Sequence, residues 1–200
     1  MSFSVVFYRI FVLAVLQMYN YLLFLRSKIQ LFFKSLPNLN IFLMKRILFV
    51  CMGNICRSAA AEAVLKKYVA DKGLQDEYEI DSAGVIGYHA GEPADSRMIK
   101  AALERGYNVD SIARRVCSQD FDRFDCVIAM DNRNVSDLRT LCRTYEHNKK
   151  LCKLTDFSSA RFMEKYKMTE VPDPYYGGPD GFDLVLDMLE DAMPQILSKF

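Results

Sequence analysis

A cysteine, five intervening residues, an arginine and then a hydroxyl residue form the pattern in this sequence that best supports chemistry. The run reads Cys51-Met52-Gly53-Asn54-Ile55-Cys56-Arg57-Ser58. Backbone N–H groups of a short loop that ends at a helix N-terminus point at an anion, and the fork of an arginine matches two phosphate oxygens. The same positive field would hold Cys51 as a thiolate, the nucleophilic form. This cysteine loop, residues 51–58, is therefore predicted to bind a phosphoryl group and to attack it.

Such an attack also requires a proton donor for the leaving group and then a base for the water that hydrolyses the phosphocysteine. Asp173 is the candidate because Pro172 and Pro174 stiffen its loop and glycines follow shortly after. Alone, a Pro-Asp-Pro sequence is more typical of an ordinary turn. Its occurrence together with the cysteine loop favours the catalytic interpretation.

Alternating short apolar and longer amphipathic runs indicate which elements position these side chains. Strands are expected at residues 46–50, 78–81, 126–130 and 150–154, and helices at 58–72, 95–105, 131–142, near 157–160 and at 181–200. This order predicts one doubly wound α/β domain, with a four-stranded parallel sheet flanked by helices. Ligands of such folds bind beyond the carboxyl ends of the strands, so Cys51, Asp131 and the loop after the fourth strand should converge there.

Composition argues against several other classes of protein. The chain has 26 Lys and Arg and 25 Asp and Glu, a net charge of +1, which disfavours nucleic acid as a partner. Its six cysteines all follow residue 50 without a zinc-type pair, so reduced thiols in a cytosol are expected rather than a disulfide framework. His89 and His147 are too scattered to suggest a metal site and are predicted to be solvated. No metal or cofactor is expected.

The first 43 residues form an apolar N-terminal extension that differs from the rest of the chain. Residues 10–25 are interrupted only by Gln17 and Asn20, slightly short of the roughly 20 residues of a spanning helix. The extension is interpreted as a mis-assigned start with Met44 as the initiator, as a membrane anchor, or as a cleaved peptide. The lysines and arginines that follow it would leave an anchored domain in the cytoplasm. Residues 44–200 are therefore expected in the cytoplasm, with membrane contact only if the extension is real and inserted.

The cysteine loop is followed along the chain by further short motifs. They are Asp81-Ser82-Ala83-Gly84, Tyr88-His89, Ala113-Arg114, Asp120-Phe121, Ala129-Met130-Asp131 and Asp173-Pro174-Tyr175. In this order and spacing, they make residues 44–200 resemble the low-molecular-weight protein-tyrosine phosphatase family. Two positions depart from it, because Ala59 stands where the family usually has proline and Arg115 where it often has glutamine. A proline in the first helical turn only stabilises the helix, so no loss of activity is expected.

The resemblance implies a role for each candidate residue. Cys51 would be the nucleophile, Arg57 the clamp for phosphate and transition state, and Asp173 the general acid and then the base. The substrate-binding residues would be Met52, Gly53, Asn54, Ile55, Cys56, Ser58, Tyr88, Tyr175 and Tyr176. Among them, Asn54 would maintain the strained shape of the loop and Ser58 would donate to the thiolate. Met52 and the tyrosines would surround an aromatic ring, which favours phosphotyrosine because only the longer side chain delivers its phosphate to the loop.

Two residues keep alternative roles. Cys56 either forms a reversible disulfide with Cys51, as the resemblance implies, or packs at the start of the helix. Asp131 caps the helix that it begins, orients Arg57, or does both.

Two other functions are weighed against a phosphatase that acts on phosphotyrosine proteins or small aryl phosphates. An arsenate reductase on the same scaffold needs two further cysteines in relay, for which Cys117 and Cys126 are candidates. Cys126, however, opens an apolar strand and is expected to be buried. A phosphotyrosine-binding module with an inactive pocket would lack the nucleophile or the acid, and this chain has both.

Overall fold

Four parallel strands lie at the centre of the computed structural model, which describes residue 28 and residues 44–200. They are β1 (Lys45–Cys51), β2 (Tyr78–Gly84), β3 (Cys126–Ala129) and β4 (Leu151–Lys153), in the order β2-β1-β3-β4. The predicted α/β fold with a four-stranded parallel sheet is confirmed, and Lys45–Phe200 forms one unit of the chain. The three interpretations of the N-terminal extension concern residues that lie outside those described, apart from residue 28.

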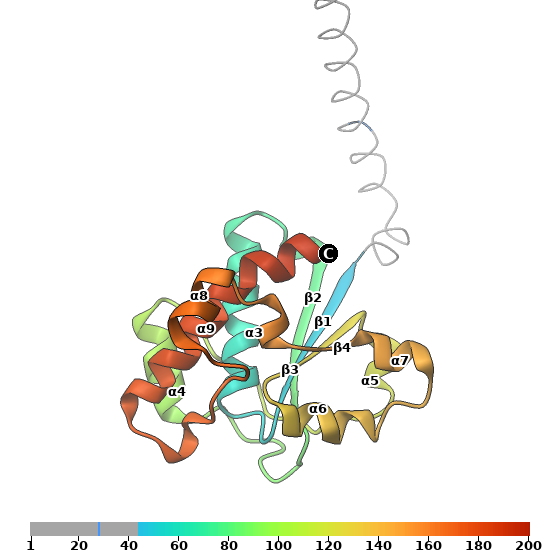
Figure 1. Cartoon of the computed structure of the whole chain (residues 1–200), viewed down its shortest axis with the longest axis horizontal. Helices are drawn as coiled ribbons and strands as arrows, with labels where there is room; N and C mark the ends of the chain where they lie inside the picture. The colour runs from blue at the N-terminus through green and yellow to red at the C-terminus, as the bar shows by residue number, and fades with distance from the viewer. Residues whose placement is uncertain (1–27, 29–43) are drawn as a thin grey trace, which may run out of the picture. The chain divides into compact units, whose positions relative to one another are not determined.

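Helices cover both faces of the sheet (Figure 1). One face carries α3 (Arg57–Asp71), α4 (Ser96–Glu104), α8 (Ala160–Tyr166) and α9 (Pro179–Lys199). The other carries α5 (Asp120–Arg123), α6 (Asn132–Arg139) and α7 (Tyr145–Lys150). Three short 3-10 helices, η1 (Gln75–Glu77), η2 (Leu154–Phe157) and η3 (Pro174–Tyr176), lie in the connections.

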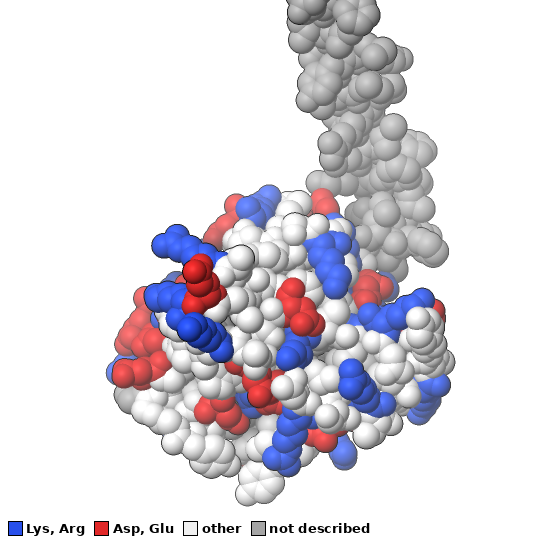
Figure 2. All heavy atoms as spheres, in the orientation of Figure 1, with Lys and Arg blue, Asp and Glu red and all other residues white. Residues whose placement is uncertain are grey.

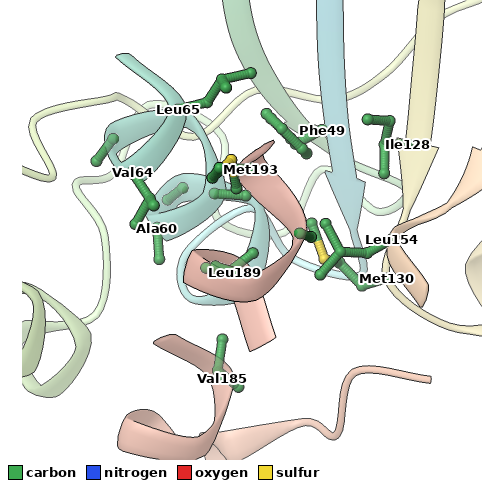
Figure 3. Close-up of a cluster of buried hydrophobic side chains, with 14 of the residues drawn as sticks. Phe49, Ala60, Val64, Leu65, Ile128, Met130, Leu154, Val185, Leu189 and Met193 are labelled. Atoms are coloured by element: carbon green, nitrogen blue, oxygen red, sulfur yellow. The ribbon is translucent and has the colours of Figure 1, made fainter. Parts of the chain in front are cut away.

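The sheet is buried on both sides because β1 is apolar at successive positions. Its Ile47 and Phe49 contact the layer of α3 and α9, whereas Leu48 and Val50 contact the opposite layer. Figure 3 shows the larger cluster, in which Phe49 and Ile128 of the sheet face side chains of α3 and α9. Burying one such side chain contributes about 1.5–3 kcal/mol, so these layers hold the strand ends in place.

The carboxyl ends of the central strands meet at one edge, where the pairing aligns Cys51 with Gly84 and Val50 with Ala129. The chain leaves β1 at Cys51, and α3 begins six residues later at Arg57. The predicted convergence of the cysteine loop and Asp131 at this edge follows from that register.

Several predicted boundaries were wrong. The helix expected at residues 131–142 ends at Arg139, the one near 157–160 is replaced by η2 and α8, and the last helix begins at Pro179. The short helices α5 and α7 were not predicted, because four to six residues show no helical periodicity. Contacts between them hold them instead: Lys150 donates to the Phe121 carbonyl over 2.7 Å.

The prediction that both histidines are solvated was also wrong. His147 is 7% exposed, its ring stacks on Phe121 with centroids 5.7 Å apart, and its Nε2 lies 2.9 Å from Asp122 Oδ1. His89 is half-buried and lies near the cysteine loop. Among the described residues, no helix is both long and apolar enough to cross a membrane.

Candidate active site

The nucleophile candidate, Cys51, is buried at the end of β1 beneath the loop that it begins. It is 3% exposed, and the Asn54 N–H donates to its Sγ over 3.3 Å. Ser58 Oγ, in the first turn of α3, lies 3.1 Å from the same sulfur. Because Ser58 Oγ already accepts from Asn54 Nδ2 at 3.0 Å, its own proton is available to Sγ or to the Ala83 carbonyl, 3.3 Å away. The Asn54 N–H and the Ser58 hydroxyl thus both lie within hydrogen-bonding distance of the sulfur.

Asn54 gives the loop its shape. Its φ of 61° is left-handed, a conformation that asparagine tolerates better than most residues. The side chain is 1% exposed, and its Nδ2 also donates to Ser82 Oγ at 2.8 Å, while its Oδ1 accepts from the Arg114 N–H at 2.9 Å. These bonds offset the strain of the backbone and tie the cysteine loop to β2 and to the segment around Arg114.

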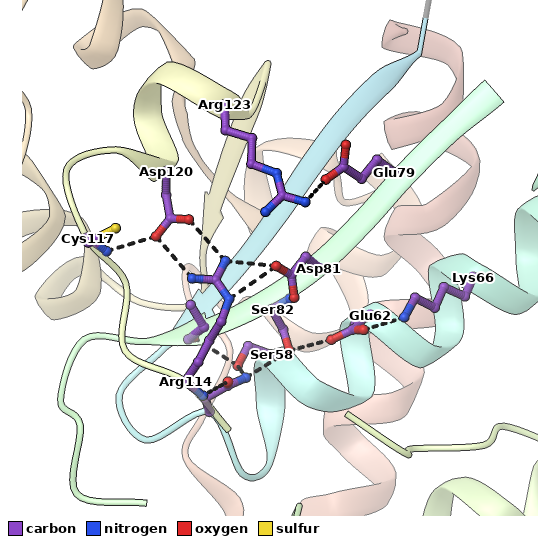
Figure 4. A network of polar contacts seen from close by, with 12 residues as sticks. Ser58, Glu62, Lys66, Glu79, Asp81, Ser82, Arg114, Cys117, Asp120 and Arg123 are labelled. Carbon is purple, nitrogen blue, oxygen red and sulfur yellow. Dashed lines mark hydrogen bonds and ion pairs between the residues drawn. The ribbon is translucent and has the colours of Figure 1, made fainter. Parts of the chain in front are cut away.

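A buried carboxylate supports this arrangement from behind. Ser82 donates to Glu62 Oε2 over 2.5 Å, and Lys66 neutralises the other oxygen of Glu62 (Figure 4). Glu62 is only 4% exposed, so its negative charge would be unfavourable without these two partners. Hydrogen bonds therefore connect the surface at Lys66 with the side chain of Asn54.

A second polar cluster holds the Arg114 segment against β2. The Arg114 guanidinium contacts Asp81 at 2.9 Å and Asp120 at 3.1 Å, and Asp120 also accepts from the Cys117 N–H at 2.8 Å (Figure 4). The backbone of the Arg114 segment extends the edge of the sheet, because the Gly84 N–H donates to the Arg114 carbonyl. The motifs Asp81–Gly84, Ala113-Arg114 and Asp120-Phe121 thus serve as the frame of the cysteine loop.

Arg57 is the buried cation of the site. It is 3% exposed and has three acceptors: Asp131 at 2.6 Å, the Val171 carbonyl at 3.2 Å and Asp173 at 3.1 Å. Burial acts to lower its pKa, but the negative charges of Cys51, Asp173 and Asp131 outweigh burial and raise the pKa above its ordinary value. Asp131 fills both roles proposed for it, since its Oδ1 caps α6 by accepting from the Asn134 N–H at 2.6 Å.

Asp173 lies at the start of η3 and faces the cysteine loop. One oxygen contacts Arg57, the other accepts from the Tyr175 N–H at 3.2 Å, and the side chain is 33% exposed. The carboxyl group is thus held over the loop and stays in contact with solvent. A proton donor that later activates water needs both properties.

A cavity of about 240 Å³ opens above Cys51 and brings most of the predicted residues together. The predicted residues that line it are Cys51, Met52, Gly53, Ile55, Cys56, Arg57, Tyr88, Asp173, Tyr175 and Tyr176. Asn54 and Ser58 do not line it, because they point beneath the loop and shape it. Tyr88 and Tyr176 are each 82% exposed and form the rim. The cavity therefore combines a floor that contains Cys51 and Arg57 with an aromatic entrance.

The model of the family described as low molecular weight phosphotyrosine protein phosphatase matches residues 46–200. The chain belongs to this family. A Streptomyces coelicolor low molecular weight protein-tyrosine-phosphatase is 42% identical over 159 residues, which are 76% of this chain and 92% of that relative. The Bacillus subtilis enzyme YfkJ is 36% identical over 157 residues, 78% of this chain and 96% of its own length.

Solved structures agree with this assignment. A crystal structure of protein tyrosine phosphatase from Entamoeba histolytica superposes with a TM-score of 0.72 and 50% identity, covering 78% of this chain and 96% of that one. The protein is thus a low-molecular-weight protein-tyrosine phosphatase, a hydrolase.

Sequence reasoning missed two residues of the phosphatase cavity. Ile86 carries no chemical signal and reaches the cavity because its N–H donates to the Met52 carbonyl at 3.0 Å. His89 belongs to the Tyr88-His89 motif, but the sequence did not predict that it lines the cavity. In the structure its Nδ1 lies 2.7 Å from Glu92.

The remaining cysteines are free thiols. Burial, with the nearby charge of Asp95, raises the pKa of Cys56 well above its ordinary value, so Cys56 is a neutral thiol at physiological pH. A disulfide between Cys56 and Cys51 stays a prediction. Cys126 is 2% exposed within the core, as expected, which places it poorly for the thiol relay of an arsenate reductase.

Proposed function

We propose that this phosphatase hydrolyses phosphotyrosine monoesters through a phosphocysteine intermediate on Cys51. The observation that carries the proposal is that Cys51, Arg57 and Asp173 line one cavity, with Arg57 Nη2 only 3.1 Å from Asp173. The nucleophile, the cation and the acid of the predicted mechanism are thus within reach of a single phosphate. Substrates are phosphotyrosine proteins or small aryl phosphates.

In the first step, the Cys51 thiolate attacks phosphorus, an S–P bond forms and the P–O bond to the tyrosyl oxygen breaks. Asp173 gives its proton to that oxygen, which leaves as a phenol. Arg57 and the backbone N–H groups of residues 52–57 neutralise the charge on the non-bridging oxygens. Preorganised donors of this kind contribute about 10²–10³-fold each to a rate.

In the second step, the Asp173 carboxylate takes a proton from water, and the water oxygen attacks the phosphocysteine. The S–P bond breaks, inorganic phosphate leaves and the thiolate returns. The Ser58 hydroxyl, 3.1 Å from Sγ, stabilises the departing sulfur. Arg57 and the backbone amides supply positive charge throughout, so the proposed mechanism contains no step that uses a metal.

The shape of the cavity supports an aryl ester. Met52, Ile86 and the tyrosines at the rim provide apolar contact for a ring, while Cys51 lies beneath them with 3% of its surface exposed. A phosphoserine is too short to place its phosphate on the cysteine loop without forcing its backbone into the entrance.

Replacing the nucleophile tests the proposal. Cys51→Ser should reduce p-nitrophenyl phosphate hydrolysis to background while inorganic phosphate still binds, because the loop amides and Arg57 remain. Cys117→Ser is the matched control: it removes an exposed cysteine and should keep the wild-type rate. Acid quenching during turnover should trap phosphate on wild-type protein and not on the Cys51 variant. A Cys51→Ser variant with the wild-type rate would contradict the mechanism, and thiol-dependent arsenate reduction without ester hydrolysis would favour the reductase.

A further inference from the structure

A second groove adjoins the catalytic cavity, and the mechanism above makes no use of it. Its volume is about 710 Å³, and it shares Met52, Arg57, Asp173 and Tyr176 with the catalytic cavity. Its far wall comes from the start of α6 and from residues 167–172. A substrate chain leaving the catalytic cavity on this side would therefore enter the groove directly.

Two cations of the groove have no ionic partner. Arg133 and Lys167 line it, and neither forms an ion pair with any of the residues that the structure describes. The carboxylates of the groove, in contrast, are all engaged. Asp131 and Asp173 contact Arg57, and Glu170 accepts from the Asn132 N–H at 2.7 Å. Glu170 keeps its negative charge, because a backbone N–H does not neutralise it, and Arg133 and Lys167 are the two cations of the groove that form no ion pair with the described residues.

A buried amide in the same wall also lacks a partner. Asn134 is 1% exposed and lines the groove, and its Oδ1 has no hydrogen-bond partner among residues 44–200. A buried polar atom of this kind is rare, because leaving it unpaired is unfavourable. An amide oxygen accepts hydrogen bonds, so the group that would complete it is a donor such as a peptide N–H. This oxygen is buried, so a peptide N–H would reach it only after the side chain turns toward the groove, whereas Arg133 and Lys167 are exposed.

We propose that this groove is a specificity subsite for an acidic residue close to the phosphotyrosine in a peptide substrate. The carboxylate contacts Arg133 and Lys167, and a peptide N–H adjacent to it donates to Asn134. An extended peptide advances about 3.3–3.6 Å per residue, so a residue two or three positions from the phosphotyrosine reaches the groove. This inference rests on the proposed function, because it selects among substrates of the same reaction.

The test compares kcat/KM for two pairs of phosphotyrosine peptides. Within a pair, one peptide has Glu and the other Gln at the second and third positions from the phosphotyrosine. These positions are on the N-terminal side of the phosphotyrosine in one pair and on the C-terminal side in the other. At low salt, wild-type protein should prefer the Glu peptide of one pair about fivefold or more, and added salt should reduce the preference. The double variant Arg133→Ala/Lys167→Ala should bring the ratio close to one. Arg133→Glu should reverse the charge preference, so that a peptide with Lys at the same positions is hydrolysed with a higher kcat/KM than the Glu peptide.

The matched control is Lys100→Ala/Lys149→Ala, which removes two exposed positive charges from α4 and α7, outside the groove. It should keep the wild-type ratio. Asn134→Leu should lower kcat/KM for both peptides relative to p-nitrophenyl phosphate, which has no backbone to bind. Equal rates for the Glu and Gln peptides with wild-type protein, or an equal loss of preference in the control, would overturn the subsite. A wild-type protein that hydrolyses no aryl phosphate would instead overturn the proposed function.

Discussion

At the scale of single residues, the site depends as much on the buried side chains that shape the cysteine loop as on Cys51, the proposed nucleophile. Asn54 uses both ends of its amide to hold a left-handed backbone, and Ser58 links it to the sulfur. Arg57 is held by three acceptors before any substrate arrives. The groups that stabilise charge are thus oriented in advance, which avoids reorganisation during the reaction.

Replacing the proposed acid should lower the rate more for esters with poor leaving groups than for esters with good ones. Asp173→Ala should lower kcat/KM, which reports the first step and not the hydrolysis of the phosphocysteine, about 100-fold or more for phenyl phosphate, and lower it much less for p-nitrophenyl phosphate, whose phenoxide leaves without a proton. Steady-state kinetics with a series of substituted phenyl phosphates measures the effect. Asp180→Ala, which removes an exposed carboxylate at the start of α9, is the control and should leave the series unchanged. Equal losses for all leaving groups would show that Asp173 is not the acid.

Gly84 is a position where one added methyl group should damage the loop. A Cβ there would lie 2.9 Å from the Gly53 carbonyl carbon and from the Met52 oxygen, both backbone atoms that have no side-chain freedom to move away. Gly84→Ala should therefore displace the cysteine loop and lower kcat/KM at least tenfold, an amount typical of misplaced catalytic groups. Gly87→Ala, which would meet only the Arg115 side chain at 3.4 Å, should behave as wild type. Equal kinetics for the two variants would contradict this explanation.

At the scale of elements, α4 and α9 are joined by a cluster of charges. Arg105, just after α4, contacts Asp183 at 2.8 Å and Asp187 at 2.7 Å on α9, and Tyr107 donates to Glu190 at 3.0 Å. The segment that contains Asp173 and η3 leads directly into α9. Arg97 of α4 also donates to the Tyr175 carbonyl at 3.2 Å. These contacts position the cavity rim relative to the sheet.

The Tyr107 contact predicts a dependence of stability on alkaline pH. Burial and the bond to Glu190 raise the pKa of Tyr107 from 10 to about 12 in the folded protein. Because the folded pKa exceeds the unfolded one, the stabilisation is complete below pH 10 and is lost as the pH rises toward about 12. The difference in unfolding free energy between wild type and Tyr107→Phe should therefore be constant below pH 10 and shrink above it.

Denaturant unfolding at several pH values measures this difference. Tyr145→Phe, at a tyrosine that is 74% exposed, is the control and should show no such change. A constant difference for Tyr107→Phe up to pH 12 would contradict the assignment.

At the scale of the whole molecule, one sheet with two covered faces carries the entire site. Charges of both signs are interspersed on the face shown in Figure 2, without a broad basic region. The family match begins at residue 46, and the unit Lys45–Phe200 contains both hydrophobic clusters. Everything that the proposed reaction uses therefore lies within residues 45–200.

A chain that begins at Met44 should consequently keep the catalytic properties of the full chain. Its kcat/KM for p-nitrophenyl phosphate should agree within about twofold, and its midpoint of thermal unfolding should fall within about 4 °C, the shift expected for less than 1 kcal/mol in a domain of this size. Thermal unfolding and steady-state kinetics measure both. Loss of folding or activity on removal of residues 1–43 would show that the extension is part of the working domain.

Much of this protein could be predicted from short stretches of sequence. The strand before Cys51, the helix after it and the loop between them can each be predicted from consecutive residues, because hydrophobic periodicity and loop composition are local properties. The same holds for the rigid loop around Asp173. These patterns were sufficient to predict the fold class and to select Cys51 and Asp173, which line one cavity in the structure.

Only the tertiary structure decided how distant residues meet. Arg57 and Asp173 are 116 positions apart, and their contact depends on strand register and on the packing of α9. The burial of His147, the helices α5 and α7, and the unpartnered amide of Asn134 also arise from contacts between separate elements. Sequence periodicity specifies which face of an element is apolar, whereas hydrogen bonding and charge pairing in the interior depend on which elements become neighbours. The cysteine loop could thus be predicted from the sequence, whereas the groove beside it could not.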